Sequence, residues 1–230
     1  MNLVFVHGAG SSSKVWTFQK RHFSDHEILL IDLPGHGGTP GDGRETISGY
    51  VEDVRKSIKS HGDSVLIGHS MGGAITLSYV LKYPATACIL AGTGAKLRVV
   101  PAILENVVDH YEQTVDLILE SAVHNKTEQI MTHSRKEMLS TPPHVTYNDF
   151  LACDTFNVMG EIHRISIPTL VIAGQQDILT PAKYSQYLAD NIRGSRLETI
   201  ENCGHMAMLE QPEAFNSAIE RFVNSLSDEP

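Results

Sequence analysis

Short, uninterrupted apolar runs bounded by Gly, Pro or Asp recur along this chain, and they restrict its fold more than any other feature. The runs cover residues 3–6, 27–31, 64–67, 86–90, 169–173 and 197–200. A run that is apolar throughout, without alternation, is typical of a strand that is covered on both faces. We therefore predict about six strands in a sheet buried between two layers.

Helical patterns lie between these runs. Apolar residues share one helical stripe in two segments, at Ile47, Tyr50, Val51, Val54 and Ile58 and, after Pro212, at Phe215, Ile219, Phe222 and Val223. Thr180-Pro181 is interpreted as the N-cap and first turn of another helix. Alternating strands and helices predict an α/β fold with a mostly parallel sheet and right-handed crossovers.

Residues 96–162 break this alternation because they contain no convincing strand pattern. Helical spacing occurs at Ile103, Val107, Tyr111, Val115 and Ile118, and again at Tyr147, Phe150, Leu151 and Val158. The pairs Asn125 with Glu128 and Thr146 with Asp149 have capping-box spacing and indicate further helix starts. So long a segment is unusual as a loop. We predict a helical lid at 96–162 on a core made of 1–95 and 163–230.

Composition and charge narrow the class of protein. With 230 residues and 41% hydrophobic content, the chain fits one main core with an insertion. The net charge is -9 and no Lys/Arg block is present, so nucleic acid is an unlikely partner. Three widely spaced cysteines argue against a disulfide framework or a zinc site, and a cytoplasmic location is the expectation. The first apolar run is too short for a signal or membrane segment.

The sharpest chemical signal is Gly68-His69-Ser70-Met71-Gly72, which follows one predicted strand and precedes the apolar run 74–80. On a tight strand-to-helix turn the two glycines remove Cβ atoms that would clash, and the turn exposes the serine hydroxyl. The alternative is an ordinary glycine-rich turn, because so short a pattern also occurs by chance. Ser70 is a candidate nucleophile that needs partners elsewhere in the chain.

A serine nucleophile needs a base within hydrogen-bond reach and a third group that orients the base. Asp177 follows the predicted strand at 169–173, and His205 follows the one at 197–200. Taken singly, a loop aspartate is more often a cap, and one histidine among twelve is more often incidental. The order Ser, Asp, His, each just past a strand, favours catalysis, because parallel strands end at the same edge of a sheet.

The first predicted strand runs into His7-Gly8-Ala9-Gly10, a turn at the same edge of the sheet. Two backbone N–H groups aimed at a tetrahedral oxyanion would lower the barrier by several kcal/mol. We assign these donors to Ala9 and Met71, with Gly10 as the next candidate. Taken alone, His7-Gly8 is better explained as a structural turn.

Together these motifs resemble the α/β-hydrolase fold family. The resemblance also includes the stretch Asp-Leu-Pro-Gly-His-Gly at 32–37, and it covers nearly the whole chain in the family's order. It implies Ser70 as nucleophile, Asp177 and His205 as its partners, and the amides of Ala9 and Met71 as oxyanion hole. The chain begins at what would be the family's third strand, so about six strands are expected instead of eight.

The resemblance is to small single-lid serine esterases and implies a serine hydrolase that cleaves carboxylic esters through an acyl-enzyme on Ser70, without metal or cofactor. Carbon–carbon bond hydrolases or lyases and cofactor-free haloperoxidases share these motifs and remain alternatives. A non-catalytic small-molecule receptor on the same fold is a further one. The expected partner is a small ester, and the chain is expected to be a monomer or homodimer without membrane attachment.

Six residues are expected to contact substrate: Gly8, Gly10, His69, Tyr111, Phe150 and Leu151. The apolar lid residues among them could instead serve only to pack the lid onto the core. His36 and His69 lack metal-ligand spacing, so a packing role in turns is favoured. Cys203 is interpreted as a buried thiol and not a redox-sensitive one.

Overall fold

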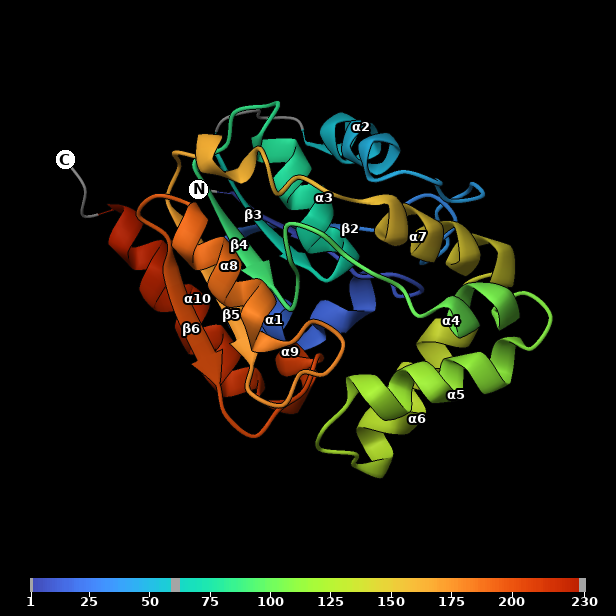
Figure 1. The fold of residues 1–230 in the computed structure, drawn as a ribbon. Coiled ribbons are helices and arrows are strands. Elements are labelled where there is room, and N and C mark those ends of the chain that lie inside the picture. The colour runs from blue at the N-terminus through green and yellow to red at the C-terminus, as the bar shows by residue number, and fades with distance from the viewer. Residues whose placement is uncertain (1, 59–62, 228–230) are drawn as a thin grey trace.

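A computed structural model describes residues 2–58 and 63–227 and contains one six-stranded sheet in the order β2-β1-β3-β4-β5-β6 (Figure 1). Every neighbouring pair of strands is parallel. The strands are β1 (Asn2–Val6), β2 (Glu27–Ile31), β3 (Ser64–His69), β4 (Ala87–Ala91), β5 (Thr169–Gly174) and β6 (Arg196–Ile200). The predicted six-stranded α/β architecture is confirmed, with each strand within two residues of its expected bounds.

Helices cover both faces of the sheet. One face packs against α2 (Ile47–Ser57), α3 (Met71–Val80) and α8 (Ala182–Asn191). The other packs against η1 (Ser13–Trp16), α9 (Ala207–Glu210) and α10 (Pro212–Ser227), and α1 (Thr17–His22) packs against α9 and α10. Side chains alternate along β1 as strand geometry requires: Val4 and Val6 join the first core cluster, and Leu3 and Phe5 join the second.

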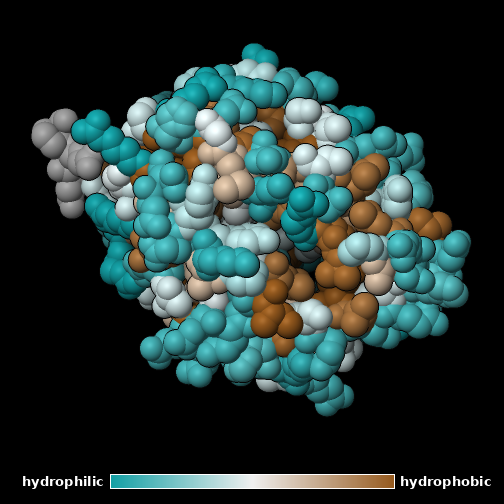
Figure 2. All heavy atoms as spheres, viewed as in Figure 1, coloured by the Kyte–Doolittle hydropathy of each residue, from teal (hydrophilic) through white to brown (hydrophobic). Residues whose placement is uncertain are grey.

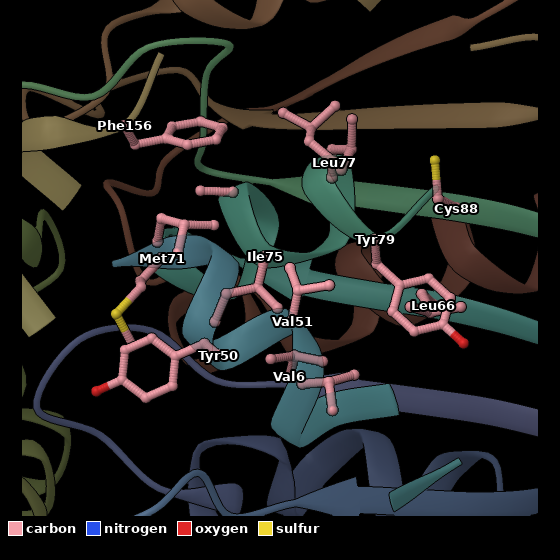
Figure 3. Packing of buried hydrophobic residues seen from close by; sticks show 14 of the residues in the cluster. Val6, Tyr50, Val51, Leu66, Met71, Ile75, Leu77, Tyr79, Cys88 and Phe156 are labelled. Atoms are coloured by element: carbon pink, nitrogen blue, oxygen red, sulfur yellow. The ribbon is translucent and has the colours of Figure 1, made fainter. Parts of the chain in front are cut away.

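Helix α3 directly follows Ser70 and is enclosed by the core. Each of its residues from Met71 to Tyr79 is buried. Figure 3 shows Ile75 of α3 beside Val51 of α2, above the strand that carries Val6. A helix that is apolar on all sides is stable only inside a core. Burial therefore holds the start of α3, and the residue before it, in a fixed position.

Between β4 and β5 the chain forms four helices. They are α4 (Pro101–Asn106), α5 (Tyr111–Ala122), α6 (Glu128–Leu139) and α7 (Pro143–Thr155), followed by η2 (Ile162–Arg164). Figure 1 shows α4, α5 and α6 beside the sheet and α7 near α2 and α3. Val115, Ile118, Leu119 and Met138 form a small core of their own. We refer to residues 96–162 as the helical insertion. A bridge between Lys96 and Asn157 joins its two ends.

Two predicted helix starts in the insertion are wrong. Thr127, not Asn125, is the N-cap of α6, and its hydroxyl accepts a hydrogen bond from the N–H of Ile130 at 3.2 Å. Thr146 and Asp149 lie inside α7 and are both buried. Short polar side chains at this spacing suit a cap and a tertiary contact equally, so the pattern alone does not distinguish them. Within the described ranges, no helix combines the length and apolarity that a membrane span requires.

Candidate active site

Ser70 lies between β3 and α3 with φ 53° and ψ -116°, a conformation that is unfavourable for a residue with a Cβ atom. Hydrogen bonds hold its backbone in place. Its N–H donates to the carbonyl of Ala91 at 2.9 Å, and its carbonyl accepts from the N–H of Gly73 and the hydroxyl of Thr93, each at 2.9 Å. The surrounding structure thus maintains a strained turn that projects the serine side chain.

The glycines on either side of Ser70 are required by close backbone approach. A Cβ atom on Gly68 would lie 2.2 Å from the carbonyl oxygen of Gly72. A Cβ atom on Gly72 would lie 2.2 Å from the carbonyl oxygen of Val6. No side chain fits at either position, so the motif is explained by the sterics of the turn.

His205 and Asp177 are brought together from two neighbouring strand ends. Asp177 follows β5 and His205 follows β6, and His205 Nδ1 lies 2.8 Å from Asp177 Oδ2. Ser70 and His205 line the same cavity. The structure therefore brings His205 to Asp177 and places His205 and Ser70 on one cavity.

Asp177 is held as a carboxylate. Burial by itself would raise its pKa, but attraction to His205 and hydrogen bonds from His205 and Thr180 outweigh burial and lower the pKa to about 2. The Thr180 hydroxyl donates to Oδ2 at 2.7 Å, and the N–H groups of Leu179 and Thr180 donate to Oδ1 at 2.9 Å each. Thr180 is thus not the N-cap of α8, which is Pro181, because its hydroxyl binds Asp177 instead.

His69 packs against His205, with ring centroids 4.7 Å apart. Its Nε2 donates to the His205 carbonyl at 3.0 Å, which fixes the backbone at the candidate base. Burial, followed by repulsion from His205, lowers the pKa of His69 to about 3, so this ring is neutral. The N–H of His205 donates to the carbonyl of Ala122 at 2.8 Å, which ties the histidine loop to the end of α5.

The turn after β1 lies against the serine. A Cβ atom on Gly8 would be 3.2 Å from Ser70 Cβ, a tight contact that glycine avoids. Met71 is the first residue of α3, and the first N–H groups of a helix have no acceptor within the helix. Ala9 thus follows a residue that lies against Ser70, and Met71 follows Ser70 directly. Gly10 is not free for this role, because its N–H donates to Asp149 Oδ2 at 2.8 Å.

Asp149 is a buried site residue that the sequence pattern misassigned as a cap. It is fully buried on α7, 113 positions from His36, whose Nε2 lies 2.8 Å from Oδ2. The hydroxyl of Tyr50 donates to Oδ1. His36 lies in the stretch at 32–37 and the Gly10 turn lies beside the serine, but neither has a sequence feature that points to position 149. Only the packing of α7 onto the core brings these groups together.

The cavity beside Ser70 has a volume of about 90 Å³ and mostly apolar walls. Figure 2 shows apolar side chains around a hollow in this region of the surface. Four of the predicted substrate contacts line the cavity, together with residues from the core loops and the insertion: Gly8, Gly10, His69 and Phe150, with Ala9, Val15, Ile118, Leu119, Ala122, His133, Ser134, Glu137, Met138, Leu179, Met206 and Leu209.

Tyr111 and Leu151, the other two predicted contacts, are not among the cavity-lining residues. The hydroxyl of Tyr111 lies 2.6 Å from the Met138 carbonyl, 2.8 Å from the Thr141 carbonyl and 2.9 Å from the Thr146 hydroxyl. Tyr111 therefore links α5 to the turn between α6 and α7. Helical spacing identified both residues as partly buried but did not show which side of the insertion they face.

Metal-ligating side chains and the thiol of Cys203 are two further features to consider near the site. No group of three or more His, Cys, Asp or Glu side chains suited to a metal ion occurs in the part of the chain that the structure describes. Cys203 is a free, buried cysteine, and burial raises its pKa to about 12. It is protonated at neutral pH and is a poor nucleophile.

Comparison with known proteins places this geometry in a family. The model of the Alpha/beta hydrolase family matches residues 3–218. A solved thermophilic esterase is 33% identical with a TM-score of 0.86, covering 97% of this chain and 90% of its own. The fold class predicted from the sequence, an α/β-hydrolase fold, is confirmed.

Two curated relatives show the range of chemistry. The pimeloyl-[acyl-carrier protein] methyl ester esterase of Nitrosomonas europaea is 25% identical, over 95% of this chain and 94% of its own. The putative 2-succinyl-6-hydroxy-2,4-cyclohexadiene-1-carboxylate synthase of Bacillus subtilis is 26% identical, over 97% of this chain and 90% of its own. Esterases and lipases among the relatives support an ester-acting hydrolase. With a matching fold, site geometry and family model, the chain belongs to the alpha/beta hydrolase family.

Proposed function

We propose that this protein is a serine esterase that cleaves small carboxylic esters through an acyl-enzyme on Ser70. The observation that carries the proposal is the pairing of His205 with Asp177 at 2.8 Å beside the cavity that Ser70 lines. Asp177 holds the Nδ1 proton of the ring, so that Nε2 is the basic nitrogen and can take the serine proton.

In the proposed reaction, Ser70 Oγ bonds to the ester carbonyl carbon while its proton passes to His205 Nε2. The carbonyl oxygen becomes an oxyanion that accepts hydrogen bonds from the N–H groups of Ala9 and Met71. Collapse breaks the bond to the alcohol, which leaves with the proton from His205. Water then gives a proton to His205 and attacks the acyl group, and the carboxylic acid departs as Ser70 regains its proton.

We assign the role of lid to residues 96–162, with 1–95 and 163–230 as the core. Three helices of this insertion contribute side chains to the cavity wall, including Ile118 from α5, Met138 from α6 and Phe150 from α7. Ser70, Asp177 and His205 all lie on the core. This division assigns bond cleavage to the core and substrate size to the insertion.

The cavity favours a short acyl group. A water molecule needs roughly 10–15 Å³ of such volume, and pockets for larger ligands span about 300–1,000 Å³. A volume of about 90 Å³ therefore suits an acetyl to butyryl group and excludes a long fatty acyl chain unless the insertion moves. Its walls are apolar near Val15, Leu119 and Met206, which favours an uncharged acyl chain.

The test is a series of p-nitrophenyl esters from acetate to decanoate with the wild-type protein and Ser70→Ala. We expect wild-type kcat/KM to be highest between two and four acyl carbons, and Ser70→Ala to lose several orders of magnitude. Phe150→Ala should extend the accepted length, because it enlarges the cavity. Near-normal turnover by folded Ser70→Ala would refute the acyl-enzyme proposal.

A carbon–carbon hydrolase or lyase is the second candidate, and the Bacillus subtilis relative is the observation in its favour. The same three residues would serve it, so geometry alone does not separate the two. Turnover of a vinylogous diketone or a cyanohydrin, with little activity on simple esters, would favour this candidate. The reverse result would favour the esterase.

A further inference from the structure

Both polar backbone atoms of Gly10 bond to the helical insertion. Its N–H donates to Asp149 Oδ2 at 2.8 Å, and its carbonyl accepts from the Thr141 hydroxyl at 3.4 Å. Gly10 has φ +62°, and a Cβ atom there would lie 2.8 Å from Met138 Cε. The insertion therefore holds Gly10, the residue after the candidate oxyanion donor Ala9, through two hydrogen bonds and close packing.

Ala9 lies between two fixed points. On one side, Gly8 approaches Ser70 so closely that a Cβ atom would be 3.2 Å from Ser70 Cβ. On the other side is Gly10, and the N–H of Ser11 closes the turn onto the Gly8 carbonyl at 3.3 Å. The peptide bond between Ala9 and Gly10 is planar, so the direction of the Gly10 N–H fixes one of the two dihedral angles at Ala9. The position of Asp149 thus influences the backbone conformation of Ala9 and the direction of its N–H.

A carboxylate suits this task better than an amide would. An ionised aspartate only accepts hydrogen bonds, so it attracts the Gly10 N–H and repels a carbonyl in the same place. An asparagine could turn its NH₂ group toward a rotated peptide and stabilise the wrong orientation equally well. The charge of Asp149 is balanced by His36, whose Nδ1 lies 3.1 Å from the Pro34 carbonyl and whose Nε2 lies 2.8 Å from Asp149. Both partners are acceptors, so both ring nitrogens carry hydrogen and the ring is a cation.

We propose that Asp149, on helix α7 of the insertion, is a positioning residue for the oxyanion hole, acting through the N–H of Gly10 to orient the Ala9 N–H toward Ser70. The inference rests on the proposed serine esterase function. It assigns the insertion a part in transition-state stabilisation, in addition to its contribution to the cavity wall.

Asp149→Asn tests the proposal, with Asp154→Asn as matched control. Asp154 is also on α7 and also accepts a backbone hydrogen bond, from Val99 at 3.0 Å, but it does not touch the Gly10 turn. For p-nitrophenyl acetate we expect Asp149→Asn to lower kcat about 10- to 100-fold, with KM within about threefold. The affinity for an aryl trifluoromethyl ketone, whose adduct with Ser70 carries an oxyanion, should fall by the same factor. Asp154→Asn should change neither quantity more than about twofold.

A reduced folded fraction would lower activity without changing trifluoromethyl ketone affinity, and that result would overturn the proposal. Normal kcat in folded Asp149→Asn, beside an inactive Ser70→Ala, would overturn it and leave the esterase function standing. Full activity in Ser70→Ala would overturn both. If Asp149→Asn does not fold, Tyr50→Phe provides the test, because it removes the hydroxyl that donates to Asp149 Oδ1 and so loosens the carboxylate that accepts from the Gly10 N–H. A drop in kcat and ketone affinity by one common factor supports the proposal, and unchanged values overturn it.

Discussion

Two histidine–aspartate pairs in this molecule have closely similar surroundings and different positions in the fold. His205 lies 2.8 Å from Asp177, and His36 lies 2.8 Å from Asp149. Each paired histidine packs against a second histidine: His69 is 4.7 Å from His205, and His7 is 4.8 Å from His36, between ring centroids. One pair joins two loops of the core beside the cavity, and the other joins the core to the insertion.

The second ring nitrogen distinguishes the two pairs. Nδ1 of His36 lies against the Pro34 carbonyl, so both nitrogens are occupied. Burial works to lower the pKa of His36, but attraction and hydrogen bonding from Asp149 outweigh it and raise the pKa above its ordinary value. This ring holds its proton. His205 has Asp177 at Nδ1 and lines the cavity, and in the proposed function its Nε2 is the nitrogen that exchanges a proton. A histidine–aspartate contact therefore indicates catalysis only where the other nitrogen is open.

The largest expected effect comes from replacing each paired histidine by glutamine. His205→Gln should lower kcat/KM for p-nitrophenyl acetate by about 10⁴- to 10⁶-fold, because no base remains for Ser70. His36→Gln should lower it less than about tenfold per folded molecule, because Asp149 can still accept the hydrogen bond from the Gly10 N–H. Steady-state kinetics with circular dichroism as a folding control check both values. Similar losses in the two variants would mean that the pairs are not functionally distinct.

For the free energy of unfolding, we expect the opposite order, with the larger loss in His36→Gln. His36→Gln leaves the fully buried Asp149 without its cation, and loss of one partner of a buried pair costs about 3–5 kcal/mol in the free energy of unfolding. His205→Gln should cost less, because Leu179 and Thr180 still donate to Asp177. Urea unfolding at pH 7 measures both. A smaller loss in His36→Gln than in His205→Gln would contradict the structural role of the second pair.

His7 and His69, which pack against the two paired histidines, should make the free energy of unfolding fall in acid. Burial, followed by repulsion from the neighbouring histidine, lowers the pKa of both His7 and His69 from 6.5 to about 3. Their folded-state pKa values are depressed, so their contribution to stability is complete above pH 6.5 and is lost as the pH falls toward about 3.

Below pH 6.5 the unfolded chain binds up to two more protons at these sites, and the free energy of unfolding should fall by up to about 2.7 kcal/mol per pH unit. The pKa of His36 is raised, so its contribution to stability is fully present below pH 6.5 and is lost as the pH rises through the pKa that His36 has in the folded protein. His36 therefore does not change the slope below pH 6.5. Urea titrations between pH 4 and 8 give the slope. His7→Asn should roughly halve it, and an unchanged slope would show that His7 is not neutral in the fold.

The smallest expected effect concerns Thr180. Thr180→Val removes the 2.7 Å hydrogen bond to Asp177 Oδ2 and keeps the side-chain shape. The pKa of Asp177 should rise above about 2, and kcat should fall about threefold to tenfold, because the carboxylate orients His205 less firmly. Kinetics at pH 7 and a urea titration near pH 3 measure these changes. No change in either would show that the backbone donors alone position Asp177.

Much of the core and its reactive loops was predictable from neighbouring residues. The six strands, the glycine-flanked Ser70, and the strand-end positions of Asp177 and His205 follow from local sterics and from hydrophobic periodicity. The helical nature of the insertion was predicted in the same way. Two of its helix starts were wrong, because a three-residue polar spacing such as Thr146 to Asp149 suits a cap and a buried contact alike.

By itself, the sequence determined which segments are strands and where the serine turn lies, because both depend on residues close together in the chain. The tertiary structure decided which carboxylates are buried, which histidines keep an open nitrogen, and which insertion residues reach the cavity. Asp149 and Gly10 are 139 positions apart, and no local pattern connects them. Their contact depends on how α7 packs against the turn after β1, a property of the folded molecule as a whole.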